Sequence, residues 1–461
     1  MTDTHLSPAE RGREGLLALV VVASIVGALT GLVAVSCRLC LEWLAEERLG
    51  VFEWAREVPI LRGALVIIVA AAMTSTASWL VHRVEPMAEG SGIPRTEAVV
   101  RGATPPGSPI ILPIKFVGGL LSIGPGLALG REGPSVHMGG NIGITMARLT
   151  GRSAADLRIL VAAGAGAGLA TAFNAPIAGA VFVLEELLKR FDPRTTLATL
   201  ASSAGGFLVS HLLISGHDFP MPPVPDPTLA QAPAYALVGL VAGLLGVVYN
   251  KGILLGLRWA DTSLWPVELR AAIIGALVAL FGLFFPTLVG GGDNLTHNFL
   301  LGGTALGPLL LILAARFALG IVSYSACVPG GLFAPQLTLG AGIGLAVALI
   351  LDDVVPALSA PASGMALVGL AAFFSATVRT PITGIVLAVE MTGTVVMLPP
   401  MLGACAVALL VAELLRSEPI YELLARRSAN AANANRRHRR DQVRDAVGRI
   451  MESYRKPGNA D

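Results

Sequence analysis

Long uncharged stretches recur along the chain and predict helices that span a membrane. Four of them are Gly15 to Ser36, Gly63 to Val81, Ala232 to Asn250 and Ala271 to Gly292. Because a helix crosses the roughly 30 Å of hydrocarbon with about 20 residues, each run is long enough to span it. A backbone in lipid must satisfy its own hydrogen bonds, so we expect an all-α polytopic membrane protein.

Composition supports this interpretation. Hydrophobic residues make up 54% of the 461 positions and charged residues only 14%, and the mean hydropathy is +0.71. The buried core of a soluble protein can contain one or two such runs, but not so many in one chain. The class indicated is therefore an integral membrane protein.

Charges near the two ends predict the topology. The amino end, MTDTHLSPAERGRE, lacks the short apolar segment and cleavage site of a removable signal peptide, so we expect the first helix to remain in the membrane. Arginine precedes that helix and is concentrated near the other end, at Arg11, Arg13, Arg426, Arg427, Arg436, Arg437, Arg439 and Arg440. The positive-inside rule then predicts a multi-pass protein with both termini in the cytoplasm. A basic tail can also bind nucleic acid or anionic lipid, but the formal net charge of +2 favours topological anchoring, and we predict no nucleic-acid partner.

The four cysteines give only a weak signal. Cys37 and Cys40 form a CxxC, whereas Cys327 and Cys405 stand alone in apolar surroundings. A second CxxC or a nearby pair of histidines would be needed to complete a zinc site, and neither is present in the sequence. We therefore predict no metal, no cofactor and no disulfide.

The chain also matches itself. GREGPSVHMGGNIG at 130–143 aligns with GLFAPQLTLGAGIG at 331–344, and FNAPIAGAVFVLEE at 173–186 aligns with VRTPITGIVLAVEM at 378–391. The offset is nearly constant, which indicates two repeated halves, and such halves often have inverted topology in transporters. The expected segments are a cytoplasmic one at 1–14, a first transmembrane half at 15–215, a proline-rich linker at 216–234, a second half at 235–425 and a basic cytoplasmic tail at 426–461.

The repeated Gly/Pro motifs predict an anion site at the interface of the halves. Broken helices present uncapped N–H groups, and glycine lets their backbone approach an ion closely. One helix end contributes about 0.3 to 1 kcal/mol, whereas a charge at mid-membrane costs about 2.5 to 3.5 kcal/mol, so several ends must converge. Glu132 lies in such a motif, and its carboxylate can compete with a mobile anion until it is protonated. This arrangement would link proton and anion movement.

These motifs resemble those of the CLC family of chloride channels and chloride/proton antiporters. The matching segments are GSGIP at 90–94, GREGP at 130–134, GGLFAP at 330–335 and EPIYELL at 418–424, in the family's order and spacing. The resemblance implies two inverted-topology repeats of broken, tilted helices. It also implies a homodimer embedded in lipid, with one pathway for chloride and protons in each subunit. The short tail resembles prokaryotic members, which implies a location in the cell (inner) membrane. By the same resemblance, serine in GSGIP indicates a preference for chloride.

The resemblance also assigns candidate site residues. It implies that the hydroxyls of Ser91 and Tyr421, with the backbone amides of Leu332 and Phe333, bind a central chloride. Further chloride-binding candidates are the amides around Arg131, Glu132 and Gly133 and the two glycines that flank Ser91, Gly90 and Gly92. Glu132 corresponds to the family's gate and outer proton acceptor.

A second glutamate distinguishes an antiporter from a channel. Glu186 matches the inner proton-transfer glutamate of the CLC antiporters, at a position that is neutral in many CLC channels. The alternative is that Glu185 and Glu186 are solvated acids at a helix end beside Lys189 and Arg190. We therefore predict a chloride/proton antiporter, with a passive voltage- or pH-gated chloride channel as the alternative.

Other polar residues carry less information. Lys115, Glu97 and Glu185 are candidates for electrostatic support, and the first two match a charged pair in bacterial relatives; a structural pair or interfacial snorkelling would explain them equally well. His137 is expected to serve in helix packing. The run VAAGAGAGLA at 161–170 predicts close helix packing and not a nucleotide loop. MAEGSGIP lacks the G-x-S-x-G elbow of a hydrolase, so no enzyme activity is predicted.

Overall fold

The computed structural model describes residues 8–214 and 219–430, and the regular elements in these ranges are helices. The predicted tail arginines Arg436, Arg437, Arg439 and Arg440 lie outside the described residues. The all-helical fold class predicted from the sequence is confirmed.

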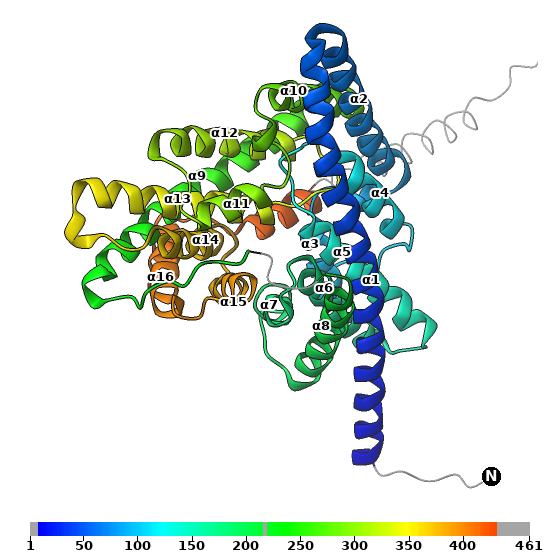
Figure 1. The fold of residues 1–461 in the computed structure, drawn as a ribbon. Coiled ribbons are helices and arrows are strands. Elements are labelled where there is room, and N and C mark those ends of the chain that lie inside the picture. Colours follow the sequence, from blue (N-terminus) through cyan, green and yellow to red (C-terminus); the bar gives the residue numbers. More distant parts are fainter. Residues whose placement is uncertain (1–7, 215–218, 431–461) are drawn as a thin grey trace, which may run out of the picture.

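Both halves build the same series of helices (Figure 1). The first half contains α1 (Pro8–Glu57), α2 (Pro59–Trp79), α3 (Ile93–Val100), α4 (Ile111–Ile123), α5 (Glu132–Leu149), α6 (Ala154–Ala172), α7 (Pro176–Phe182) and α8 (Pro193–Leu213). The second contains α9 (Ala232–Thr262), α10 (Val267–Phe284), α11 (Asp293–Leu300), α12 (Leu306–Tyr324), α13 (Phe333–Val354), α14 (Ala362–Val378), α15 (Pro381–Thr392) and α16 (Leu398–Leu414). Two π-helical turns, Leu80–Val84 and Val183–Leu187, extend α2 and α7.

The repeat relation is visible in the packing. Helix α5 packs on α6 as α13 packs on α14, and α1 packs on α8 as α9 packs on α16. Equivalent helices also meet across the halves: α2 packs on α10, and α7 packs on α15 (Figure 1). Broken helices in two inverted repeats, as the sequence predicts, account for this arrangement.

Eight helices in the described ranges are long and apolar enough to cross a membrane. The predicted runs at Gly15 and Gly63 lie in α1 and α2, and the run at Ala232 begins α9. The run from Ala271 to Gly292 was predicted too long, because α10 ends at Phe284. Pro286 begins a 3-10 turn there and lacks the N–H that a continuing helix needs.

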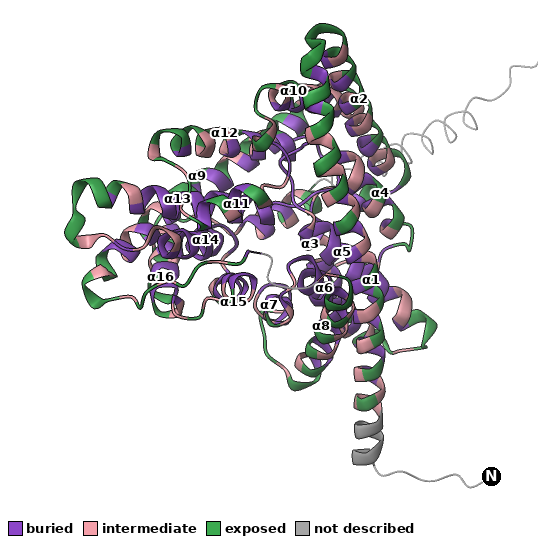
Figure 2. Ribbon diagram, in the orientation of Figure 1, coloured by how far each residue is buried: buried purple, intermediate pink, exposed green. Residues whose placement is uncertain are grey.

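One side of α1 carries a stripe of exposed apolar residues. They recur every three or four positions, which is the period of one helix face. The exposed residues are Leu17, Val21, Ile25, Leu29 and Leu32. Figure 2 shows exposed and buried positions alternating along this helix, whereas the elements near the centre of the molecule are mainly buried. The exposed stripe is suited to contact lipid.

Small residues bring the central helices into close contact. A Cβ atom built on Gly164 of α6 would lie 2.1 Å from the carbonyl oxygen of Gly139 in α5. In the second half a Cβ on Gly340 of α13 would lie 2.7 Å from the carbonyl oxygen of Gly369 in α14. A side chain at either glycine would push the helices apart, so the predicted packing role of the glycine run is confirmed.

The proline-rich segment and the last described residues connect the halves. Residues 219–228 form no helix, and the Phe219 N–H donates to the carbonyl of Met391 at 3.0 Å. Near the end of the chain Arg427 pairs with Asp261 at 2.6 Å and with Glu89 at 2.9 Å. Arg427 therefore has a structural role in addition to the predicted contribution to topology.

Candidate functional site

Three interruptions between helices meet at one place: the residues before α3, before α5 and before α13. The Gly130 N–H donates to the Gly331 carbonyl and the Gly331 N–H donates back to the Gly130 carbonyl, both at 2.8 Å. The Gly330 N–H donates to the Gly90 carbonyl at 3.1 Å. The glycines that the self-comparison paired thus bind each other across the halves.

Glycine is required at several of these positions. Gly90 and Gly92 have φ angles of +60° and +81°, in the left-handed region that favours glycine. A Cβ on Gly133 would lie 2.7 Å from the Cβ of Ser91. We call the segment 90–92, which precedes α3, the Ser91 loop. The start of α5 can approach this loop only because residue 133 has no side chain.

Glu132 is the first residue of α5 and is 1% exposed. Its Oε2 accepts a hydrogen bond from the Ala334 N–H, in the first turn of α13, at 3.4 Å. The carboxylate of the first half therefore lies at the amino end of a second-half helix. This is the position that a bound anion would take, because unpaired N–H groups and the helix dipole converge there.

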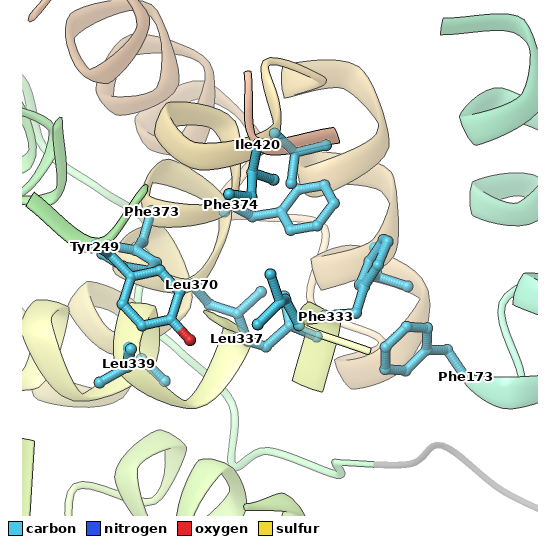
Figure 3. Packing of buried hydrophobic residues seen from close by; sticks show 14 of the residues in the cluster. Phe173, Tyr249, Phe333, Leu337, Leu339, Leu370, Phe373, Phe374 and Ile420 are labelled. Atoms are coloured by element: carbon cyan, nitrogen blue, oxygen red, sulfur yellow. The ribbon is translucent and has the colours of Figure 1, made fainter. Parts of the chain in front are cut away.

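Leu332 and Phe333 begin the same helix, where backbone N–H groups have no intrahelical acceptor. The Phe333 ring is buried and packs against Phe374, with ring centroids 4.5 Å apart, and against Phe173 at 5.5 Å. Figure 3 shows this aromatic group with Leu337. The Phe333 side chain thus fixes the start of α13 against the core, and the first backbone N–H groups of the helix remain without an intrahelical acceptor.

Tyr421 is fully buried, and its hydroxyl has no hydrogen-bond partner among the described residues. The Tyr421 hydroxyl is close enough to Glu132 and Glu186 for their charges to act on it. Sequence analysis missed a second tyrosine, Tyr324 at the end of α12, whose hydroxyl faces Ser91. No motif draws attention to Tyr324, because only the fold brings α12 to the Ser91 loop.

The two adjacent glutamates have different environments. Glu186 lies in the π-helical turn after α7, is 2% exposed, and its Oε1 has no partner in the described part of the chain. Glu185 instead accepts hydrogen bonds from the Ile382 and Thr383 N–H groups at 3.0 and 2.7 Å. It thus caps the amino end of α15, which gives Glu185 a structural task that Glu186 lacks.

Glu390 makes the equivalent contact in the other direction. Its carboxylate accepts from the N–H groups of Ile177 and Ala178, at the start of α7, at 3.0 and 2.7 Å. Each of the two repeat-related helices therefore ends in a glutamate that caps the other. This pair of caps holds α7 and α15 together beside Glu186.

Lys115 and Glu97, two of the candidates for electrostatic support, bind different partners. Glu97 pairs with Arg101 at 2.7 Å, one turn further along the chain. Lys115 is fully buried on α4 and donates to the carbonyls of Glu89 and Gly90. Lys115 therefore supports the Ser91 loop by binding the backbone carbonyls of that loop and not a carboxylate.

His137 and the segment after Glu186 complete the surroundings. A Cβ built on Gly92 would lie 2.3 Å from Nδ1 of His137, so this ring packs directly on the Ser91 loop, in line with the predicted packing role. Lys189 forms an ion pair with Glu422, next to Tyr421. The hydrogen bond from Lys189 holds the pKa of Glu422 below its usual value.

Glu132 lies at the wall of a small cavity, which we call the Glu132 cavity. Its volume is about 70 Å³, and charged and backbone groups from both halves line it, among them Glu42, Arg48, Arg131, Glu132, Asp293 and Ala334. The buried carboxylate therefore borders a partly open cavity to which charged groups of both halves contribute.

An all-helical membrane protein that directs helix ends from two inverted halves at one buried carboxylate has the architecture of an ion transport protein. Residues 73–413 match the family model described as voltage gated chloride channel. The chain therefore belongs to this family, the CLC family.

Its relatives include H(+)/Cl(-) exchange transporter ClcA of Salmonella agona, which is 34% identical over 422 residues and 89% of each chain. The ClcA of Citrobacter koseri has the same identity and coverage. Among solved structures, a slow cyanobacterial Cl-/H+ antiporter superposes with a TM-score of 0.86 at 31% identity, over 90% of this chain and 99% of that one. A CLC-type fluoride/proton antiporter, at 22% identity and a TM-score of 0.75 over 90% and 98% of the two chains, shares the fold.

Proposed function

We propose that this chain is a chloride/proton antiporter, a secondary active transporter and not an enzyme. The observation that carries the proposal is the buried Glu132 carboxylate, which accepts the Ala334 N–H at the start of a helix from the other half. When Glu132 is charged, its carboxylate occupies the place of an anion at the start of α13. When Glu132 is protonated, the charge that attracts it to this helix end is gone. The names of the ClcA relatives agree with coupled exchange.

Chloride would bind where the interruptions meet. The proposed ligands of the central ion are the hydroxyls of Ser91 and Tyr421 and the amides of Leu332 and Phe333. Support comes from the unpartnered, buried hydroxyl of Tyr421 and from the helix start at Phe333. The amides around Arg131, Glu132 and Gly133 would serve the outer position, and Gly90 and Gly92 let the Ser91 loop turn.

Glu186 is the proposed inner proton acceptor. It is buried and leaves an oxygen without a partner, whereas the neighbouring Glu185 is engaged as a helix cap. Burying a charge beside an unpartnered oxygen is costly, and a group that carries a proton for part of its working cycle is neutral during that part. This difference favours the antiporter over the passive channel.

Orientation and assembly follow the sequence prediction. We infer that both termini face the cytoplasm of the inner membrane, because Arg11 and Arg13 precede the first span and the chain ends in a basic tail. In that orientation the Glu132 cavity would face the outer side, because Glu42 and Arg48, which line it, lie toward the carboxyl end of α1. We also propose a homodimer with a separate pathway in each subunit, by analogy with the family.

The test uses purified protein in liposomes with a chloride gradient, a clamped membrane potential and no initial pH gradient. We expect chloride flux to drive protons in the opposite direction. Glu186→Gln should retain chloride flux and lose this proton movement. Chloride flux without proton movement in the wild-type protein would instead establish a channel.

A further inference from the structure

The Glu132 cavity has a charged rim that the proposed transport cycle does not use. Arg131, which directly precedes Glu132, pairs with Asp293 at 2.9 Å. Its guanidinium also lies 3.9 Å from Glu42, and Glu42 pairs with Arg38 at 2.7 Å. The side chain of Arg131 is 11% exposed and that of Asp293 is 40% exposed, so the pair lies where the cavity meets solvent.

The repeat explains why Asp293 lies at the rim of the Glu132 cavity. The segment 290–293 is the second-half counterpart of 90–93, and both lead into helices of eight residues, α11 and α3. Gly290 and Gly292 have φ angles of +85° and +102°, like their first-half counterparts. The first-half loop presents Ser91 to the central site, whereas the second-half loop presents Asp293 to the Glu132 cavity.

The position of Arg131 matters because it is the cation nearest to Glu132 along the chain. A nearby cation favours the charged form of a carboxylate, and a nearby anion favours the neutral form. Helix α13 faces Glu132 with the backbone N–H of Ala334. The titratable and charged groups that line the cavity around Glu132 are Arg131, Asp293 of α11, and Glu42 and Arg48 of α1, with Arg38 behind Glu42.

The other cation on the rim is already engaged. Arg48 donates to the carbonyl of Gly124 at 2.8 Å and to that of Ile123 at 3.4 Å, at the end of α4. Asp293 and Glu42 both line the cavity, but Asp293 lies closer to Arg131, at 2.9 Å against 3.9 Å. Its charge therefore acts most directly on Arg131 and, through the shared cavity, also on Glu132.

We propose that Asp293 is a positioning residue for the gate. By pairing with Arg131 it holds that guanidinium at the rim of the cavity and limits how strongly the cation favours the charged, closed form of Glu132. This inference rests on the proposed role of Glu132 as a gate, but it does not require that the protein move protons.

The experiment measures chloride flux as the outer pH is lowered, with reconstituted protein. Asp293→Asn replaces the carboxylate by a neutral amide and leaves Arg131 with the more distant Glu42, and both changes favour charged Glu132. We expect the pH of half-maximal flux to move about one unit lower. This is at the low end of the pKa shift that a close opposite charge causes in a carboxylate, because the rim of the cavity is partly exposed to solvent.

Three variants serve as controls. Asp293→Glu keeps the charge and should restore most of the wild-type midpoint. Glu42→Gln should give a smaller shift in the same direction, because Glu42 lies further from Arg131 and is already paired. Glu47→Gln removes the same charge from an exposed position of α1 that does not line the cavity, and should leave the midpoint unchanged.

A double variant separates action through Glu132 from a general effect on folding or ion entry. In a Glu132→Gln background, Asp293→Asn should cause no further shift in pH dependence. An unchanged midpoint in the single variant, or a shift of equal size in the Glu132→Gln background, would overturn the inference. Neither result would affect the proposed antiport, which the proton measurement tests separately.

Discussion

At the start of α5 the first half places a carboxylate, Glu132, where the second half places an aromatic ring, Phe333, at the start of α13. The same contrast recurs at Glu186 and Met391, which the self-comparison aligns. The helix-capping glutamates Glu185 and Glu390, by contrast, are present in both halves. Residues that support the backbone are thus duplicated, whereas the carboxylates proposed for transport occur once.

The physical reason lies in the pathway. In the proposed transporter, two inverted halves enclose one pathway, so each half needs helix ends and glycines to form its share of the wall. One gate and one inner proton acceptor are sufficient, and a second buried carboxylate would add a desolvation cost without a function. The second half can therefore use Phe333 to fix the helix against Phe374 and Phe173.

The largest effect should come from removing Glu132, the proposed gate in the first half. Glu132→Gln keeps the shape of the side chain but removes its charge and its titration, so we expect proton coupling to fall below detection while chloride still passes. Flux should also lose its dependence on outer pH, as measured in liposomes. As a control, Glu390→Gln makes the same Glu-to-Gln change at a second-half glutamate that caps a helix, and it should retain coupling. Persistent coupling in Glu132→Gln would refute the gate assignment.

A smaller effect should come from the duplicated caps. Loss of a helix N-cap typically costs about 1 kcal/mol, so Glu185→Gln and Glu390→Gln should lower the free energy of unfolding by similar amounts. Thermal unfolding of the purified variants would measure this. Clearly unequal losses, or a loss of proton coupling in Glu185→Gln as complete as in Glu186→Gln, would contradict a purely capping role for Glu185.

The smallest effect should come from the ion pair that joins the Glu186 segment to the Tyr421 segment. The hydrogen bond from Lys189 holds the pKa of Glu422 below its usual value, so the pair stabilises the fold above the unfolded-state pKa and loses this effect as pH falls through the folded-state pKa. The partners are 39% and 32% exposed, which limits the contribution to a few tenths of a kcal/mol.

Glu422→Gln tests this contribution. The variant should be slightly less stable than the wild-type protein at neutral pH, and the difference should disappear in acid. A difference that grows in acid would show that Glu422 stabilises the fold in its neutral form.

Sequence patterns identified the fold and most of the candidate site. The self-comparison paired Gly130 with Gly331, and the structure joins them by reciprocal hydrogen bonds. The uncharged runs located three spans well, but the fourth was extended past Phe284 because a hydropathy pattern does not register the proline that ends the helix. The sequence left the partners of Lys115 open, because it does not reveal which carbonyls a lysine will reach.

The sequence by itself determined the membrane class, the repeat and the location of Glu132 in a broken helix, because hydropathy, glycine and proline act locally along the chain. Only the tertiary structure decided that Glu132 meets Ala334, that Glu185 and Glu390 cap each other's helices, and that Asp293 pairs with Arg131. These contacts join residues from opposite halves. Their partners depend on how the inverted repeats pack, which no local pattern encodes.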